Sequence, residues 1–224
     1  MTFSVTGRCR RTGMFGVAVS TSSIAVGARC PFARAGVGAV ATQNITNPSL
    51  GPKGLDLLAA GLGAKEVVER LVSEERFPEF RQLAVIGRAG PPAHYSGAKT
   101  LGTHNVAPGA DCVAAGNLLA NLNVPKAMAD SFDGHPELHL ADRLVRALEA
   151  GLAAGGEVGP VKSAALYVVD KHPWPLADLR VDWRDGPIAA LRELWLVYEP
   201  QMDAYMTRAS NPSAAPAYGV PGER

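Results

Sequence analysis

Short runs of alternating apolar and polar residues fill the first 43 positions of the chain. Residues 2–9 (TFSVTGRC) alternate, and residues 14–20 (MFGVAVS) follow a turn with the sequence RRTG. A period of two is typical of a strand, so these two runs predict a β-hairpin. Residues 23–30 and 35–43 are two further β runs, rich in small residues and separated by Pro31. We therefore expect four strands before the first helix.

The spacing of apolar residues becomes helical in the next segment and then returns to that of strands. Residues 47–80 keep apolar side chains three and four positions apart on both sides of a glycine break, which predicts two short helices or one kinked helix. Residues 81–97 predict strands around a Gly-Pro-Pro turn, and residues 110–117 predict another strand. Helices are then expected over residues 124–132 and 136–150, where Pro136 supplies a start signal and Gly151 a stop signal.

The last third of the chain predicts one strand, one long helix and a tail. Residues 162–170 (KSAALYVVD) form a strong strand signal, and residues 186–206 place a row of apolar side chains on one face of a helix. From Ala209 the sequence is rich in Ser, Pro, Ala and Gly. We expect a single domain over residues 1–208 and a tail over residues 209–224 that is poorly ordered or forms an arm at a subunit interface.

The order of these elements predicts the fold class. Strands and helices come in groups (β-β-β-β, α-α, β-β-β, α-α, β, α) and do not alternate, which disfavours a doubly wound parallel sheet. We expect an α+β fold, namely a four-layer αββα sandwich of two mainly antiparallel sheets with helices outside. The many Ala, Gly and Val residues in the strands suit close packing of one sheet on the other.

Composition narrows the class of protein without naming a function. The chain has 224 residues, with 22 Lys and Arg against 21 Asp and Glu, so its net charge favours neither nucleic acid nor an anionic membrane. No apolar stretch reaches the roughly 18 residues of a membrane helix, and no secretory signal is evident. The three cysteines are far apart and lack metal-ligand spacing, which favours a reducing compartment. We expect a cytoplasmic protein without a cofactor.

Several stretches together resemble one protein family. They are MTFSV, TGMFGVAVS, AVGARCPFARAGVGAVATQN, NPSLGPKGLDLLAAGL, GNLLAN and DLRVDW, and they extend over roughly residues 1–200. These stretches are similar to the domain-of-unknown-function 1028 family, which is regarded as Ntn-hydrolase-like. The resemblance implies the sandwich fold of the N-terminal-nucleophile hydrolases, the class that includes proteasome β subunits. It also implies a candidate nucleophile at Thr2, but no settled activity.

One departure from the family pattern concerns the activation of this nucleophile. Many members read Gln-Ser-Lys after the second strand, where this chain has Ser20-Thr21-Ser22, so Ser22 takes the place of a lysine. Arg29 and Arg34 are then the candidates for the missing positive charge.

Thr2 has two interpretations. If Met1 is removed, Thr2 carries both a hydroxyl and a free α-amine with a reference pKa of about 7.7–8.0, and the amine can accept the hydroxyl proton. The resulting chemistry is acyl transfer from an amide or a similar bond. Threonine is also common as an ordinary second residue, and by itself it identifies nothing.

An acyl-transfer site needs hydrogen-bond donors directed at the developing oxyanion. Gln43 and Asn44 end one predicted strand, Asn117 ends another, and Thr21 and Ser22 lie where the second strand returns beside the first. All five are candidate oxyanion or substrate-binding residues. The alternative is that they only bond turns at strand ends.

Three further motifs are open to both a functional and a structural interpretation. Residues 36–41 (GVGAVA) match part of a dinucleotide fingerprint, but they lie within a β run, so close sheet packing explains them better. His135 and His139 have the i, i+4 spacing of metal ligands but no acidic or cysteine partner, and we expect a solvated helix start and no metal site. Asp178 and Arg180 fit a surface ion pair or a carboxylate-binding site.

The sequence supports two functional hypotheses. The first is an N-terminal-nucleophile amidohydrolase that acts on a small amide or lactam-like metabolite through Thr2. The second is a non-catalytic member of the same fold that binds a small molecule or serves as an oligomeric scaffold. In either case we expect a homo-oligomer, with a dimer favoured, because the last helix has more apolar surface than one face can bury.

Overall fold

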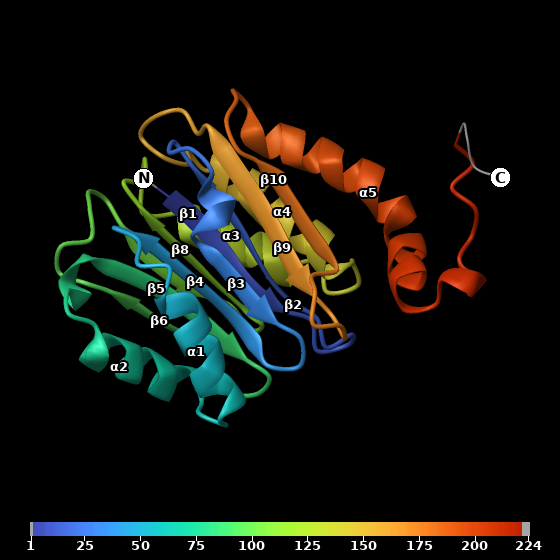
Figure 1. Cartoon of the computed structure of the whole chain (residues 1–224). Coiled ribbons are helices and arrows are strands. Elements are labelled where there is room, and N and C mark those ends of the chain that lie inside the picture. Colours follow the sequence, from blue (N-terminus) through green and yellow to red (C-terminus); the bar gives the residue numbers. More distant parts are fainter. Residues whose placement is uncertain (1, 221–224) are drawn as a thin grey trace.

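The computed structural model describes residues 2–220 and contains two antiparallel sheets that lie face to face (Figure 1). The six-stranded sheet has the order β10 (Ala177–Val181), β9 (Ser163–Val169), β2 (Phe15–Thr21), β1 (Thr2–Arg8), β8 (Cys112–Asn117) and β7 (Asn105–Pro108). The four-stranded sheet has the order β3 (Pro31–Arg34), β4 (Gly38–Asn44), β5 (Arg81–Gly87) and β6 (Ala93–Ser96).

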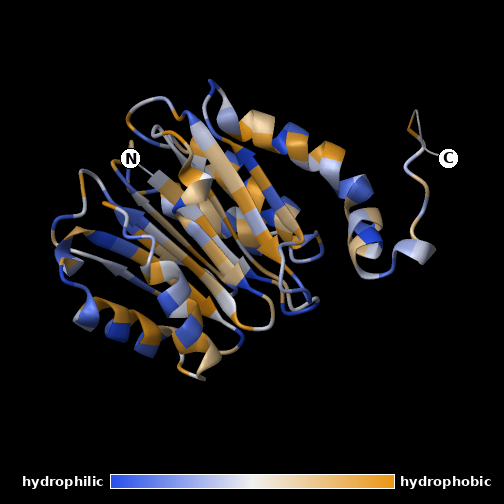
Figure 2. Cartoon of the chain, viewed as in Figure 1, coloured by the Kyte–Doolittle hydropathy of each residue, from blue (hydrophilic) through white to orange (hydrophobic). Residues whose placement is uncertain are grey.

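Helices cover the outer faces of both sheets. Two helices pack on the four-stranded sheet, namely α1 (Leu50–Ala59) and α2 (Ala64–Glu74). Three helices pack on the six-stranded sheet or along its edge, namely α3 (Val124–Asp133), α4 (Leu140–Ala153) and α5 (Pro187–Ser210). Hydrophobic segments of the helices and strands alternate with hydrophilic ones in Figure 2, as expected for elements that bury one face. The predicted α+β organisation with two mainly antiparallel sheets is confirmed.

Strand β1 is buried on both faces because it is a central strand covered from both sides. Phe3 and Val5 point into the apolar layer beneath α3 and α4. Ser4, one position away, instead reaches the facing sheet and bonds Gln43. This alternation is the period-two geometry of a strand. It directs the even-numbered side chains of β1 into the gap between the sheets.

The prediction of a strand over residues 23–30 was wrong. Residues 23–30 contain a short 3-10 helix (Val26–Ala28) that follows Ala25 in a left-handed conformation, and the third strand is Pro31–Arg34. Pro31 tolerates this place because it is the first residue of an edge strand, where a missing N–H costs little. The short edge strands β7 and β10 were absent from the predicted order of elements.

The boundaries of the last helices differ from the predicted ones. Helix α4 begins at Leu140 and not at Pro136, since His139 caps it by accepting a hydrogen bond from the Ala141 N–H. Gly151 does not stop α4, which continues to Ala153; a Cβ on Gly151 would lie 2.7 Å from Met128, so the glycine allows close packing there. Helix α5 extends through Pro200 to Ser210.

The predicted tail is partly helical at its start, and its residues 221–224 lie outside the described residues. No helix within residues 2–220 is both long enough and apolar enough to cross a membrane.

Candidate functional site

The layer between the two sheets changes character along its length. Over most of that length it is apolar, with mostly small or branched side chains and one aromatic ring, from Val17, Ala39, Ala41, Ala84, Ile86, Val113, Val169 and Phe15. At one end it is polar, and we call this the polar end; its side chains are Thr2, Ser4, Thr21, Gln43, Gln82 and Asn117, all buried. Burying polar side chains costs free energy, and the rest of this layer is filled by apolar side chains. The polar end is therefore a candidate functional site.

The amides of the polar end form a continuous network centred on Gln82. The Ser4 hydroxyl donates to Gln43 Oε1 (2.6 Å), and Gln43 Nε2 donates to Gln82 Oε1 (2.8 Å). The same Gln82 oxygen accepts from Asn117 Nδ2 (3.1 Å), while Gln82 Nε2 donates to Ser96 Oγ and to the Gly116 carbonyl. Since an amide nitrogen carries two hydrogens, Gln43 and Asn117 each retain a second N–H beyond these bonds.

Thr2 occupies the start of β1 at this end. Its backbone pairs with Asn117 of β8, and its side chain lies beside Thr21 of β2, with the two hydroxyl oxygens 3.3 Å apart. The Thr21 hydroxyl also accepts the Ser23 N–H (3.3 Å). Thr2 is only 6% exposed. The expected proximity of Thr21 to Thr2 is therefore present in the structure.

Glu157 is an acidic neighbour that the sequence did not point to. It follows α4 in a glycine-containing loop, is 6% exposed, and accepts the Ser22 N–H at Oε2 (3.2 Å). Its Oε1 atom is buried and has no hydrogen-bond partner within residues 2–220. Burial raises the pKa of the Glu157 carboxyl to about 7, against the opposing effects of the N-terminal ammonium charge and of hydrogen bonds from Ser22 and Thr21. This carboxyl therefore changes charge near neutral pH.

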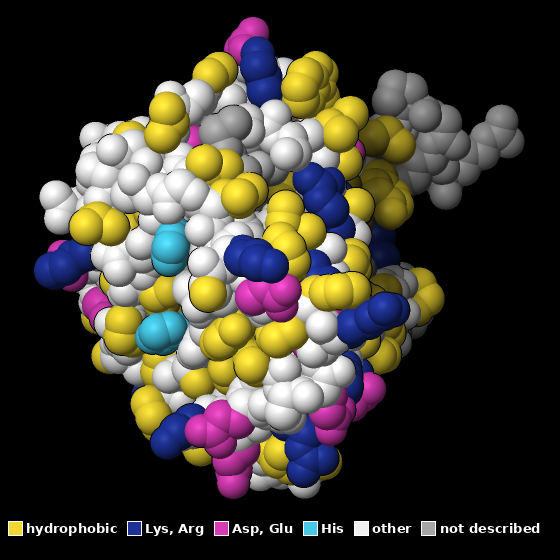
Figure 3. Space-filling view, turned by 90° about the vertical axis from the view of Figure 1, so that its left-hand side faces the viewer, with side chains coloured by type: hydrophobic (Ala, Val, Ile, Leu, Met, Phe, Trp, Pro, Cys, Tyr) yellow, Lys and Arg dark blue, Asp and Glu magenta, His cyan; other side chains and the backbone are white. Residues whose placement is uncertain are grey.

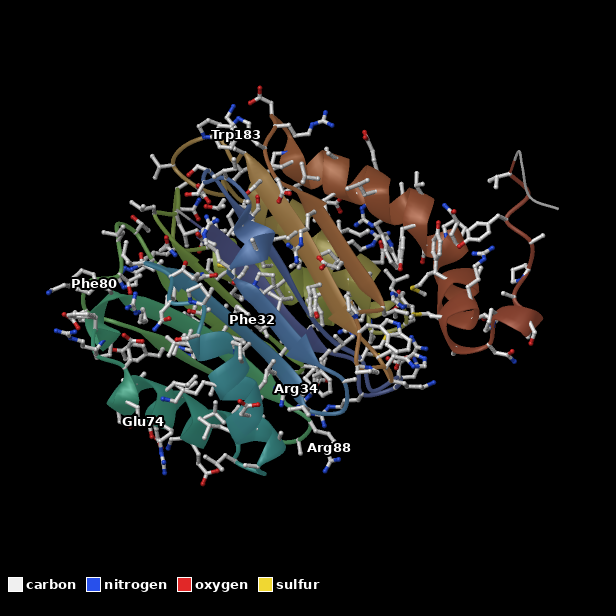
Figure 4. All side chains as sticks on the ribbon, viewed as in Figure 1. Phe32, Arg34, Glu74, Phe80, Arg88 and Trp183 are labelled. Atoms are coloured by element: carbon white, nitrogen blue, oxygen red, sulfur yellow. The ribbon has the colours of Figure 1, made fainter. Side chains whose placement is uncertain are left out.

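The two candidate arginines lie outside this cluster. Arg29 turns its guanidinium back onto its own loop and donates to the carbonyls of Ile24 (2.6 Å) and Ala25 (3.0 Å). Arg34 pairs with Asp56 of α1 (2.8 Å) and lies opposite Gly38, at the far end of β4 from Gln43. Figure 4 places Arg34 near Arg88, at the end of the molecule away from Trp183. These guanidinium contacts of Arg29 and Arg34 are all to residues outside the polar end.

Asn44 is tied into loop structure. It has a left-handed conformation, its Nδ2 donates to the Phe80 carbonyl (2.6 Å), and its Oδ1 accepts the Leu101 N–H (3.2 Å). These bonds join three loops next to the polar end. The turn-bonding interpretation fits Asn44, whereas Gln43 and Asn117 lie inside the amide network.

The opposite end of the inter-sheet layer is closed by a buried ion pair. Arg8 is 1% exposed; its Nε donates to Asp111 (2.8 Å) and its two terminal nitrogens donate to the carbonyls of Gly87 and Gly90. All three nitrogens of this guanidinium therefore donate hydrogen bonds at that end of the layer. Thr2 and Arg8 thus mark the two ends of one strand, and only the Thr2 end carries amides, hydroxyls and a titrating carboxyl together.

The remaining motifs have structural contacts. A Cβ on Gly38, within GVGAVA, would lie 2.4 Å from the Ile86 carbonyl, so that glycine allows close strand packing. His139 caps α4 and stacks on Trp195. Arg180 forms a two-pronged ion pair with Asp178 (2.7 and 2.9 Å). Within residues 2–220 no three His, Cys, Asp or Glu side chains are grouped so that they could hold a metal ion.

Two antiparallel sheets with a threonine at the start of a central strand define the class of protein, an α+β protein with a polar inter-sheet site. Residues 2–191 match the model of the Family of unknown function (DUF1028), and the chain belongs to that family.

One solved structure agrees with this assignment. The crystal structure of protein SPO2555 from Silicibacter pomeroyi, described with the same family, is 29% identical, with a TM-score of 0.81 and 88% of each chain covered. Anbu (ancestral beta-subunit) from Yersinia bercovieri is 12% identical over 97% of this chain and 100% of that chain, with a TM-score of only 0.36. A search of curated proteins gives no match.

Proposed function

We propose that this protein is an N-terminal-nucleophile amidohydrolase that cleaves a small amide or lactam-like metabolite, with Thr2 as its nucleophile after removal of Met1. The observation that carries the proposal is the position of the Thr2 hydroxyl. It lies at the polar end of an inter-sheet layer, 3.3 Å from Thr21 and beside a network of buried amides. The four-layer arrangement supports an Ntn-hydrolase-like sandwich.

In the proposed first step the Thr2 α-amine takes the proton of the Thr2 hydroxyl while Oγ1 attacks the amide carbon. The C–O bond forms, the carbonyl π electrons move to oxygen, and the second N–H groups of Gln43 and Asn117 are the candidate donors to that oxyanion. Collapse breaks the C–N bond, and the ammonium returns its proton to the leaving amine. Water then hydrolyses the acyl ester by the same route, which regenerates Thr2.

Glu157 has a role in this proposal that differs from that of a lysine, because it supplies a negative charge. A carboxylate stabilises the ammonium that forms when the Thr2 amine accepts a proton, because opposite charges favour each other at low dielectric. A free threonine amine has a reference pKa of about 7.7–8.0, and the Glu157 carboxyl has a pKa of about 7, so the two groups titrate in a similar range. In this proposal the ammonium passes its proton to the leaving group while Glu157 balances its charge.

The proposed setting is the cytoplasm, in agreement with three free and buried cysteines. A homodimer is proposed because α5 exposes Leu194, Leu196 and Val197.

The test begins with intact mass and N-terminal sequencing of protein from its native source. We expect a chain that starts at Thr2 and hydrolyses a member of a panel of small amides and lactams. Thr2→Ala should abolish this activity, and Thr2→Ser should retain part of it. Thr6→Ser is the matched control, because Thr6 is a buried threonine on the same face of β1. Quantitative retention of Met1 would favour the non-catalytic scaffold, and full activity of Thr2→Ala would rule out Thr2 as the nucleophile.

A further inference from the structure

A cavity lies far from the polar end, between three separate parts of the chain. Its volume is about 170 Å³. The turn of the β1–β2 hairpin contributes Met14, the β9–β10 loop contributes His172 and Trp174, and α5 contributes Met202 and Met206. Nothing in the proposed hydrolase reaction uses these residues.

The lining of this cavity is rich in methionine thioether groups. The chain has five methionines, and three of them line this one cavity. Met202 and Met206 are one helical turn apart and so share a face of α5. Met14 and Met202 also pack in the large core, as methionines often do. Core packing does not account for the imidazole beside them, because the ring of His172 is only half-buried and stacks on Trp174 with the centroids 4.6 Å apart.

The charge of the cavity favours a cation. Asp170 and Asp203 line it, and Lys171 is the cationic side chain of the lining, with its Nζ 4.0 Å from Asp170. Behind the lining lies His139, whose Nε2 is buried and has no hydrogen-bond partner within the described part of the chain. Burial and the positive charge of Arg11 lower the pKa of His139, whereas the negative charges of Asp203, Asp142 and Asp170 oppose that shift, so both carboxylates of the lining act on this region.

The walls of the cavity are held together by specific contacts. Tyr198 of α5 donates its hydroxyl to the Leu176 carbonyl of the β9–β10 segment (2.7 Å). Pro200 then interrupts the helical hydrogen bonds of α5, and Figure 1 shows the helix changing direction in its second half. Met202 and Met206 follow this bend and lie beyond residue 191, where the family match ends.

We propose that this cavity binds one soft monovalent metal ion, Cu(I), through the thioethers of Met14, Met202 and Met206 and the imidazole of His172. Thioether and imidazole donors suit Cu(I), whereas hard cations prefer all-oxygen sites. The carboxylates balance the charge of the ion, and the face of Trp174 adds a cation–π attraction. Each methionine has three rotatable bonds, which let its sulfur turn toward the ion. The proposal is independent of the chemistry at Thr2.

The test is an anaerobic Cu(I) titration of the full-length protein in competition with a chromogenic Cu(I) chelator, repeated with Ag(I) and read by tryptophan fluorescence. We expect one bound ion per chain. We also expect the bound ion to quench tryptophan fluorescence, and this quenching should be absent in the variant Trp174→Phe. The double variant Met202→Leu/Met206→Leu should weaken binding at least about tenfold, since it removes two of the four donors. Leucine conserves volume, so these variants should fold.

Met128→Leu is the matched control, because Met128 is buried in the same large core but does not line the cavity. Its affinity should equal that of the unsubstituted chain. The proposal is overturned if the unsubstituted protein yields all Cu(I) to the chelator, or if the double variant keeps the ion with unchanged affinity. Binding of tetramethylammonium in place of Cu(I) and Ag(I) would assign the cavity to an organic cation instead.

Discussion

The hydroxyl of Ser4 donates a 2.6 Å hydrogen bond to the side-chain oxygen of Gln43, and this bond joins the two sheets at their polar end. Ser4 belongs to β1, the strand that carries Thr2, and Gln43 belongs to β4 in the facing sheet. The position of Thr2 is thus fixed relative to both sheets. A candidate nucleophile held in this way needs little reorganisation before it reacts.

The amide network should contribute measurably to stability. Gln82→Met keeps the length of the side chain but removes the oxygen that accepts from Gln43 and Asn117. We expect a loss of about 1–3 kcal/mol in the free energy of unfolding for each buried donor left without a partner. Urea unfolding followed by circular dichroism measures it. Ser96→Ala, which removes a half-buried acceptor at the edge of the network, should cost less; equal losses would contradict the central role of Gln82.

The buried Arg8–Asp111 ion pair at the far end should contribute much more to the free energy of unfolding than the exposed Arg10–Asp111 pair. Arg8→Met removes a guanidinium that is 1% exposed and leaves the Gly87 and Gly90 carbonyls without their donor. We expect a loss of about 3–5 kcal/mol. Arg10→Met is the control, because Arg10 pairs with the same Asp111 but its side chain is 64% exposed, and its loss should be about 0–1 kcal/mol. Denaturant midpoints that fall equally in both variants would refute this difference.

Glu157 should make the protein less stable as the pH rises. Its pKa is about 7 in the folded chain and 4.5 for an ordinary glutamate, so between these pH values the unfolded chain loses the proton that the folded chain keeps. The stabilisation that comes from this retained proton is fully present below about pH 4.5 and is lost by about pH 7. It amounts to about 3 kcal/mol in the free energy of unfolding. Glu157→Gln should therefore gain stability relative to the unsubstituted chain across this window.

The measurement is urea unfolding of both proteins at several pH values from about 4.5 to about 8. Glu69→Gln provides the control, since Glu69 is exposed on α2 and should show no such trend. A stability difference between Glu157→Gln and the unsubstituted chain that is constant over the window would mean that Glu157 is charged throughout.

The cysteines should be unreactive in the folded protein. All three are buried and free, and burial raises the pKa of the Cys30 thiol to about 12 and also raises that of Cys112. Burial also acts to raise the pKa of the Cys9 thiol, but hydrogen bonds from Thr12 and Arg11 outweigh this effect and lower that pKa, so the protection of Cys9 rests on its 3% exposure alone. Because a thiol must be both ionised and accessible to react, a thiol-specific chromogenic disulfide at about pH 8 should label none of the three within minutes. In guanidinium chloride three thiols per chain should react. Rapid labelling of the native protein would reveal an opening that the fold does not predict.

Periodicity predicts the buried elements of this fold and fails at its edges. Strands such as β1 and β9 and helices α1 and α2 bury a whole face, so their apolar spacing is strong. Strand β7 has four residues, none of them fully buried, and pairs on one side only, so little in its sequence marks it. The start of α4 was misplaced because a proline is a weaker signal there than the cap formed by His139.

The candidate site was predictable where strand ends determine it. Thr2, Thr21, Gln43 and Asn117 end or begin adjacent or facing strands, and the sheets bring them to one end. Ser4 was missed although it shares a face with Thr2 at i+2, which is a readable signal. Arg29 and Arg34 have long side chains whose partners depend on the folded surface, and no local pattern fixes those partners. Glu157 lies in a loop after α4, where no periodicity applies.

The distribution of charged side chains on one face of the protein agrees with the nearly equal numbers of basic and acidic residues in the sequence. In the view of Figure 3, basic and acidic side chains are interspersed with hydrophobic ones, without a large patch of one sign on that face. Specificity toward a substrate or partner on that face would therefore rest on individual contacts and not on long-range attraction.

Strand β1 pairs with β2 on one side and with β8 on the other, and β2 in turn pairs with β9. Residues 2–8 are therefore made before residues 112–117, which complete the pairing of β1, and before residues 163–169, which extend its sheet. If Met1 is removed early, as proposed above, the surroundings of Thr2 are assembled only later, when β8 and the loop that carries Glu157 have been made. In that case the order of translation keeps the proposed terminal amine and hydroxyl apart from their acidic and amide neighbours until those segments exist.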